Sequence, residues 1–120
     1  MISGMKYLGV DFGLKRIGLA ISDGQLASPW KVIEVDELFS EVTNFDKVVI
    51  GVPEGKMGKI VGKVVKSLRG KGLDIIEVDE TLSSQQATIE MVKLNISKKK
   101  RKVNDAYSAA IILQDYLDNL

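Results

Sequence analysis

The chain has 120 residues, 45% of them hydrophobic, and a net charge of +1, which fits one domain built around one core. It contains no cysteine and no histidine, which excludes disulfides, thiolate zinc sites and every histidine-dependent catalytic arrangement. Any catalysis must therefore use carboxylates, lysines, hydroxyls, backbone amides or a bound hard metal ion. Because no apolar run is long enough to span a bilayer and no signal-peptide pattern is present, we expect a cytoplasmic protein without membrane association.

The first half of the chain predicts an antiparallel start. Lys6–Phe12 and Ile17–Ser22 are short apolar runs joined by a tight link, which favours a hairpin over a parallel crossover. A third strand is expected at Val32–Val35, after a break at Ser28-Pro29. A short helix follows over 36–43, with Asp36 as its N-cap.

The second half alternates strands with helices. Lys47–Val52 is rich in β-branched residues, which is typical of a central parallel strand buried on both faces. The remaining predictions are a helix at Lys59–Arg69, a strand at Asp74–Val78, a helix from Ser83 or Ser84 to about Lys93, a lysine-rich loop over 96–102 and a last helix from Asn104 to about Leu117. This order predicts a mixed α/β sheet with an antiparallel beginning, later parallel strands and helices on both faces.

Acidic residues stand at the ends of three predicted elements. Asp11 lies at the end of the first strand, where ligands bind in α/β folds, although a turn aspartate bonded to backbone amides explains it equally. Asp79 and Glu80 follow a strand, and alternation predicts that only one of them reaches a shared site. Asp105 begins the last helix, where its negative charge could simply interact favourably with the helix dipole. It also shares one face of that helix with small residues, which predict close packing against the sheet.

Taken together, these acids predict a metal site. Asp11, Glu80 (or Asp79) and Asp105 are expected to converge at one edge of the sheet. Because their ligand atoms are all oxygen, the expected cation is Mg²⁺ or Mn²⁺. Such an ion would support phosphodiester hydrolysis.

Two basic blocks complement these acids, although each is also explained as a solvated face or loop. They predict contacts with phosphates, which give affinity without sequence readout. The predicted nucleic-acid-binding residues are Lys15, Arg16, Lys56, Lys59, Lys63, Lys98, Lys99, Lys100, Arg101 and Lys102.

Four segments in this order resemble the YqgF/RuvX family of Holliday-junction resolvases, which are also described as pre-16S rRNA nucleases. The resemblance covers nearly the whole chain from Met5 on, whereas we expect residues 1–4 to be a disordered or non-native start. It implies a single RNase H-like domain, a metal-dependent nuclease site, and branched DNA or precursor rRNA as the partner. The segments are GVDFGLKRIGLAISD (9–23), VVIGVPEGKMG (48–58), DETLSSQQA (79–87) and NDAYSAAIILQDYLD (104–118), which align the family's acidic motifs with Asp11, Asp79-Glu80 and Asp105-Ala106.

Two departures from the family pattern bear on substrate contacts. Thr81 stands where the family has an arginine, and the segment over 53–58 is short and lysine-rich. They favour an alternative reading, in which the chain is a non-catalytic nucleic-acid-binding or ribosome-assembly factor. A third reading, a phosphate-binding loop of an actin-like ATPase or sugar kinase, requires a second lobe that 120 residues cannot supply. The related RuvC-type resolvases act as dimers, so a monomer and a homodimer both stay open.

Overall fold

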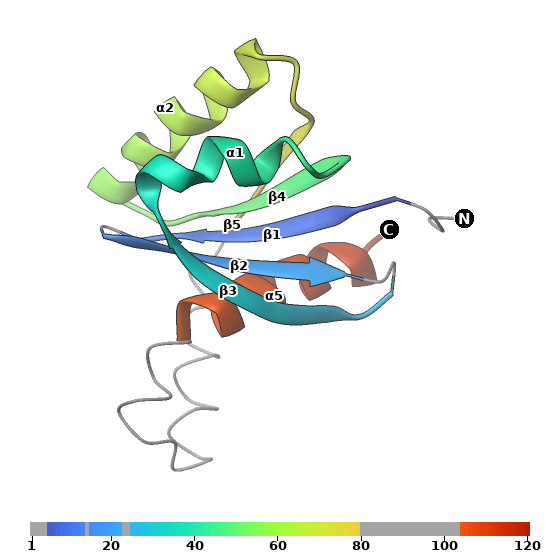
Figure 1. The fold of residues 1–120 in the computed structure, drawn as a ribbon. Coiled ribbons are helices and arrows are strands. Elements are labelled where there is room, and N and C mark those ends of the chain that lie inside the picture. The colour runs from blue at the N-terminus through green and yellow to red at the C-terminus, as the bar shows by residue number, and fades with distance from the viewer. Residues whose placement is uncertain (1–4, 14, 23–24, 80–103) are drawn as a thin grey trace.

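The computed structural model describes residues 5–13, 15–22, 25–79 and 104–120. They form one five-stranded sheet with helices on both faces (Figure 1), which confirms the predicted mixed α/β class. The order across the sheet is β3-β2-β1-β4-β5. The strands are β1 (Tyr7–Phe12), β2 (Arg16–Ser22), β3 (Ala27–Glu34), β4 (Lys47–Val52) and β5 (Ile75–Asp79).

The sheet is antiparallel on one side of β1 and parallel on the other. The strands β1, β2 and β3 pair as an antiparallel meander, as the short link between the first two predicted. The strand β4 lies between β1 and β5 and runs parallel to both. Its residues Val48, Val49 and Ile50 are all buried, because a central strand covered on both faces needs apolar side chains on each of them.

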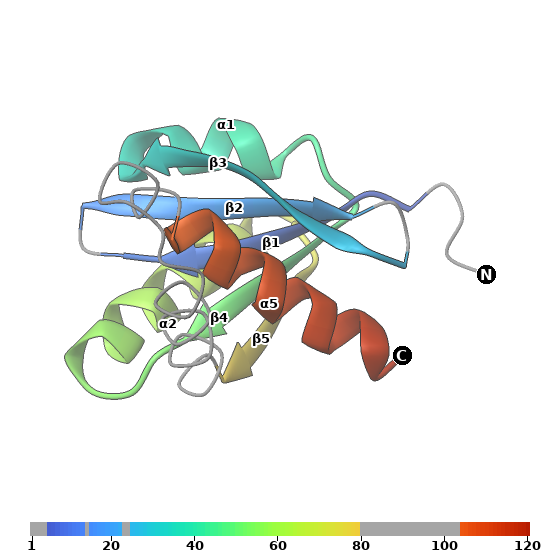
Figure 2. The same ribbon diagram turned by 90° about the horizontal axis from the view of Figure 1, so that it is seen from below.

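The helices make two layers. A short 3₁₀ turn, η1 (Val35–Glu37), leads into α1 (Leu38–Val42), and both lie with α2 (Lys56–Gly70) on one face. Seen from below, α5 (Asn104–Asp118) crosses the opposite face (Figure 2). The helix predicted to end near Lys93 and the lysine-rich loop over 96–102 lie outside the described residues.

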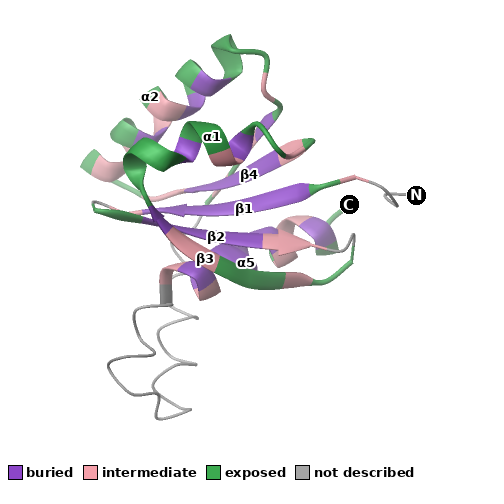
Figure 3. Ribbon diagram, in the orientation of Figure 1, coloured by how far each residue is buried: buried purple, intermediate pink, exposed green. Residues whose placement is uncertain are grey.

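Strand alternation divides the core into two clusters, one on each side of the sheet. Leu8, Val10 and Phe12 of β1 belong to the cluster beneath α1 and α2, whereas Tyr7 belongs to the cluster beneath α5. The inner strands are consequently buried along most of their length, while the outer surface of α2 is exposed (Figure 3). Neighbouring residues of one strand therefore serve different faces.

The third strand begins earlier than predicted. The expected break at Ser28-Pro29 is wrong, because β3 starts at Ala27 and contains Pro29. An edge strand tolerates proline, which lacks an amide for pairing, and the register of β3 also shifts opposite Leu19 and Ala20.

Two helix starts also differ from the prediction. The helix α2 begins at Lys56 rather than Lys59, since Gly55 has a φ of 77° and turns the chain directly into the helix. The N-cap assigned to Asp36 is wrong, because Asp36 lies inside η1, whose N-cap is Glu34, and the N-cap of α1 is Glu37. In the described part of the chain, no helix combines the length and the apolar character needed to cross a membrane.

Candidate active site

Asp11 lies near the carboxyl end of β1, on the face that α5 covers. The cluster beneath α5 contains Tyr7, four positions earlier, so Asp11 faces that side by alternation. Its residue exposure is only 8%, which is unusual for an aspartate. Asp11 pairs with Gly18 of β2 and with Gly51 of β4, and neither cross-strand neighbour carries a side chain. Neither neighbouring strand therefore places a side chain beside this carboxylate.

The first turn of α5 lies directly on this part of the sheet. A Cβ atom added at Gly18 would come within 2.0 Å of the backbone carbonyl of Asp105. One added at Gly9 would come within 2.7 Å of the carbonyl oxygen of Ala109. The glycines and the buried alanines of α5 thus let helix and sheet backbones approach closely. This confirms the predicted small-residue stripe and brings Asp105 beside Asp11.

The electrostatics of Asp105 reflect this proximity. Burial raises the pKa of the Asp105 carboxyl above its usual value, and the negative charge of Asp11 raises it further. The Arg16 guanidinium lowers it in part, since Arg16 begins the strand that carries Gly18. Asp11 and Asp105 thus form an acidic pair with Arg16 nearby, and such a pair attracts further positive charge.

Strand alternation sets Asp79 away from this pair. Asp79 ends β5 in register with Val52, and alternation sets it with Ile75 on the face that α2 covers. Val78, one position earlier, belongs with the cluster beneath α5. Glu80, like Thr81, lies outside the described residues.

The predicted basic residues lie on two sides of the acidic pair. Lys15 and Arg16 are exposed at the turn between β1 and β2. Lys56, Lys59 and Lys63 are exposed on α2, on the opposite face of the sheet from α5. Because β4 runs parallel to β1, the start of α2 lies at the same end of the sheet as Asp11. The remaining basic residues, Lys98, Lys99, Lys100, Arg101 and Lys102, lie outside the described residues.

The short segment over 53–58 forms a tight connection. At Gly58 in the first turn of α2, an added Cβ atom would lie within 2.2 Å of the carbonyl oxygen of Pro53. Only Pro53, Glu54 and Gly55 separate β4 from α2. The departure noted in the sequence is therefore a compact turn that holds the helix start against the strand end.

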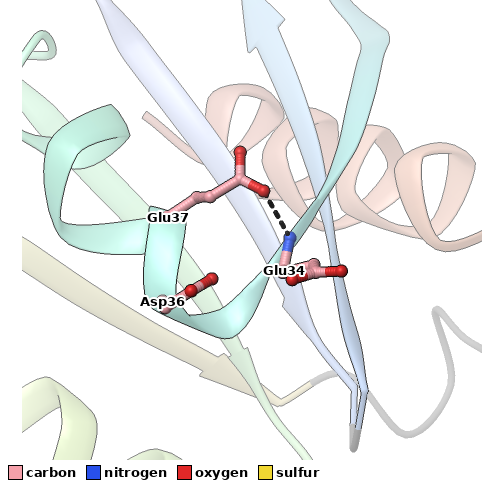
Figure 4. A group of neighbouring side chains, drawn as sticks. All are labelled: Glu34, Asp36 and Glu37. Atoms are coloured by element: carbon pink, nitrogen blue, oxygen red, sulfur yellow. Dashed lines mark hydrogen bonds between the residues drawn. The ribbon is translucent and has the colours of Figure 1, made fainter.

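A separate acidic group lies at the junction of β3 and η1 (Figure 4). The carboxylate oxygens of Glu34, Asp36 and Glu37 come within 4.8 Å of one another, and all three residues are exposed. The backbone N–H of Glu34 donates a hydrogen bond of 3.4 Å to Glu37 Oε1, which ties the strand end to the turn. This group was not predicted as a site, and its exposure distinguishes it from the pair of buried Asp11 and half-buried Asp105.

Comparison with known proteins identifies the family. A family model described as "RuvX: Holliday junction resolvase" matches residues 5–119. The chain belongs to the RuvX family. Two similar proteins are each named "Putative pre-16S rRNA nuclease". The protein of Sulfurihydrogenibium sp. is 37% identical over 96% of this chain and 91% of its own length. That of Bacillus cytotoxicus is 36% identical over 96% and 99%.

Solved structures of low sequence identity share the fold of this RuvX chain. A fowlpox virus resolvase in complex with Holliday junction DNA has a TM-score of 0.62 at 13% identity, over 96% of this chain and 98% of that one. RuvC of T. thermophilus, in complex with a Holliday junction substrate, has a TM-score of 0.55 at 16% identity, over 96% and 94%. The expected RNase H-like fold is therefore confirmed.

Proposed function

We propose that this chain is a metal-dependent endonuclease that cleaves phosphodiester bonds in structured nucleic acid. The meeting of Asp11 and Asp105 on one face of the sheet is the observation that carries the proposal. They come from β1 and from α5, which lie at opposite ends of the sequence. If Asp11 served only as a turn residue and Asp105 only as a helix-capping residue, the two side chains would have no reason to lie together. Membership of the RuvX family and the names of its relatives support the nuclease activity.

The acidic pair fits a hard divalent cation. Asp11 and Asp105 offer carboxylate oxygens, the donors that Mg²⁺ and Mn²⁺ prefer, and their mutual repulsion is relieved by a bound cation. We assign the third carboxylate to Glu80 from the sequence, because Asp79 lies on the α2 face of the sheet. Such an ion, when bound, activates water and stabilises the attacking and leaving oxygens of a phosphodiester displacement.

The surrounding residues prepare this site for a polyanion. Gly18 lets the first turn of α5 lie against β2, which sets Asp105 beside Asp11, and Gly51 adds no side chain next to Asp11 on the β4 side. Arg16 and Lys15 stand on one side of this end of the sheet, and Lys56 begins the helix on the other. These cations hold phosphates without reading bases, which suits recognition by shape.

Branched DNA and precursor rRNA are the two substrates to test. Cleavage of a four-way DNA junction and of a pre-16S rRNA fragment should require Mg²⁺ or Mn²⁺. Asp11→Asn and Asp105→Asn should each lower the rate by more than about 100-fold, because even residues that only support metal ligands cost 10–100-fold. Asp36→Asn, which removes a carboxylate from the exposed group, is the matched control and should cleave normally. Full activity in Asp11→Asn would disprove the assignment.

A second candidate function is binding without catalysis, as in a ribosome-assembly factor. Thr81 in place of the family arginine and the compact turn after Pro53 both favour it. It predicts RNA binding that weakens with salt, together with no cleavage in Mg²⁺ or Mn²⁺. Under this alternative, Asp11→Asn would leave RNA binding unchanged and there would be no activity to lose.

A further inference from the structure

A groove opens on the face of the sheet opposite the acidic pair. It encloses a cavity of about 340 Å³ between α1 and α2, with Phe12 among the residues that line it. This volume is within the range of sites that bind ligands or anchor side chains. Phe12 follows Asp11 in β1, and alternation turns the two side chains to opposite faces. A molecule in the groove therefore leaves the Asp11 side of the sheet open.

The walls of the groove are mainly apolar and partly exposed. Val35 and Phe39 are exposed by 43% and 47%, although residues of this kind are usually buried in a monomer. On α2 the lining residues include Val64 and Ser67, with exposed Ile60 one turn before Val64, and Lys71 follows just past the end of the helix. The apolar side chains on the two walls, Phe39 and Val64 among them, form a surface of the kind on which an amphipathic helix docks.

Charges of opposite sign border the groove at two places. The Lys71 ammonium lies 4.8 Å from the centre of the Phe39 ring, which places a cation at one rim. The exposed carboxylates of Glu34, Asp36 and Glu37 flank Val35 at the β3–η1 junction. The groove thus offers positive charge near Phe39 and negative charge near Val35.

We propose that this groove binds an amphipathic helical segment of a partner protein. Its apolar side chains enter between α1 and α2, an acidic side chain meets Lys71, and its other end is basic where it faces the carboxylates. Nucleic acid fits the groove itself less well, since Ser67 and Lys71 are the only polar side chains among its lining residues. The proposal goes beyond the nuclease function and does not rest on it.

The test uses fluorescently labelled synthetic helical peptides of about twelve residues, long enough to present apolar anchors at i, i+3, i+4 and i+7. One peptide has glutamates at one end and lysines at the other, with leucines or phenylalanines as anchors. A second has the two charged ends exchanged, and a third has serine at the anchor positions. Fluorescence anisotropy with the full chain should show saturable binding of the first peptide, weaker binding of the second and none of the third.

Variants of the chain then place the binding in the groove. Phe39→Ala and Lys71→Glu should each lower the affinity for the first peptide by about tenfold. Lys71→Glu should also raise the affinity for the second peptide. Leu26→Ala, at an apolar residue exposed by 66% outside the groove, and Lys66→Glu, elsewhere on α2, are matched controls that should bind normally.

Other occupants give different outcomes. The proposal fails if no peptide binds saturably, or if binding is equal in Phe39→Ala and wild type. Sedimentation that shows self-association lost in Phe39→Ala would assign the groove to a second copy and overturn it. A loss of single-stranded RNA binding in Phe39→Ala would assign it to nucleic acid and overturn it as well. Junction or rRNA cleavage should be unchanged in both groove variants.

Discussion

At Asp105, burial and the neighbouring charge of Asp11 both favour the protonated carboxyl. The pKa is therefore higher in the folded chain than in the unfolded one, so the folded state binds this proton more tightly. A raised pKa contributes stability at low pH, and that contribution is lost as pH rises through the folded value. The charge of Asp105 consequently destabilises the metal-free protein at neutral pH.

Replacing Asp105 by asparagine tests this effect. Without divalent ions, the free energy of unfolding of Asp105→Asn at about pH 8 should exceed that of the wild type, and the difference should shrink toward about pH 4. Urea unfolding at both pH values measures it. Asp36→Asn, at an exposed carboxylate, should show no comparable gain. A destabilised Asp105→Asn at pH 8 would contradict the repulsion inferred for the pair.

Sequence patterns predicted the acids and their convergence, but not every glycine beside them. Asp11 and Asp105 were both expected in the site, since each ends or begins a predicted element. The flanking role of Gly51 was missed, because only the register of β1 against β4 sets this glycine beside Asp11. A glycine inside an otherwise β-branched central strand is the signal that could have revealed it.

On the scale of elements, the contact between α5 and the sheet positions the site. Gly18→Ala should destabilise the protein by about 3 kcal/mol or more, because its Cβ would overlap the backbone of Asp105 and neither backbone can yield cheaply. Gly18→Ala should also weaken Mn²⁺ binding, because it displaces Asp105. A change confined to β2 would leave Mn²⁺ binding unaltered. Thermal unfolding and Mn²⁺ titration are the measurements.

Gly62 provides the control for that substitution. It lies within α2, and a Cβ atom there would meet nothing within 4 Å. Gly62→Ala should therefore stabilise the helix by about 0.5–1 kcal/mol. If Gly18→Ala proves as harmless as Gly62→Ala, α5 does not lie against β2 as described.

The other end of α5 is attached to the hairpin between β2 and β3. Gln114 Oε1 accepts a hydrogen bond of 2.8 Å from the Ala27 amide, and Gln114 Nε2 donates one of 2.9 Å to the Gln25 carbonyl. Gln114→Ala should cost about 1–3 kcal/mol in urea unfolding, since backbone groups lose their partners. Asn119→Ala, near the chain end, should cost less. Equal losses would show that the hairpin attachment contributes little.

Element boundaries were predicted less well than element types. The start of β3 was missed because Pro29 normally signals a break, whereas an edge strand accepts it. The start of α2 was missed because its first turn lacks apolar residues at helical spacing. That spacing begins only after Lys59. Local signals of this kind do not report which strand lies at the edge.

On the scale of the whole molecule, the basic residues of α2 and those of the β1–β2 turn flank one end of the sheet. Changing Lys56, Lys59 and Lys63 together to alanine should weaken binding of a DNA junction. The plot of the logarithm of the association constant against the logarithm of the salt concentration should also become less steep. Its slope should change by about one for each phosphate that the variant no longer neutralises. Binding measured across a salt series reads this out. Lys71→Ala, at the far end of α2, is the control and should retain the wild-type slope.

The layered architecture was predictable because alternation and helical spacing are repeated along the chain. The double role of β1 was not stated beforehand, although it follows from alternation: Asp11 serves the acidic pair, and Phe12 lines the groove. Functions on opposite faces of one sheet become visible only when both layers of helices are placed.

Titration of Mn²⁺ into the protein by calorimetry tests the central claim, that Asp11 and Asp105 together hold the cation. Wild type and Asp36→Asn should bind Mn²⁺ with equal affinity, whereas Asp11→Asn and Asp105→Asn should each lose more than about 100-fold. Unchanged binding in Asp11→Asn, or a loss confined to Asp36→Asn, would contradict the account and assign the cation to the exposed acids at the β3–η1 junction.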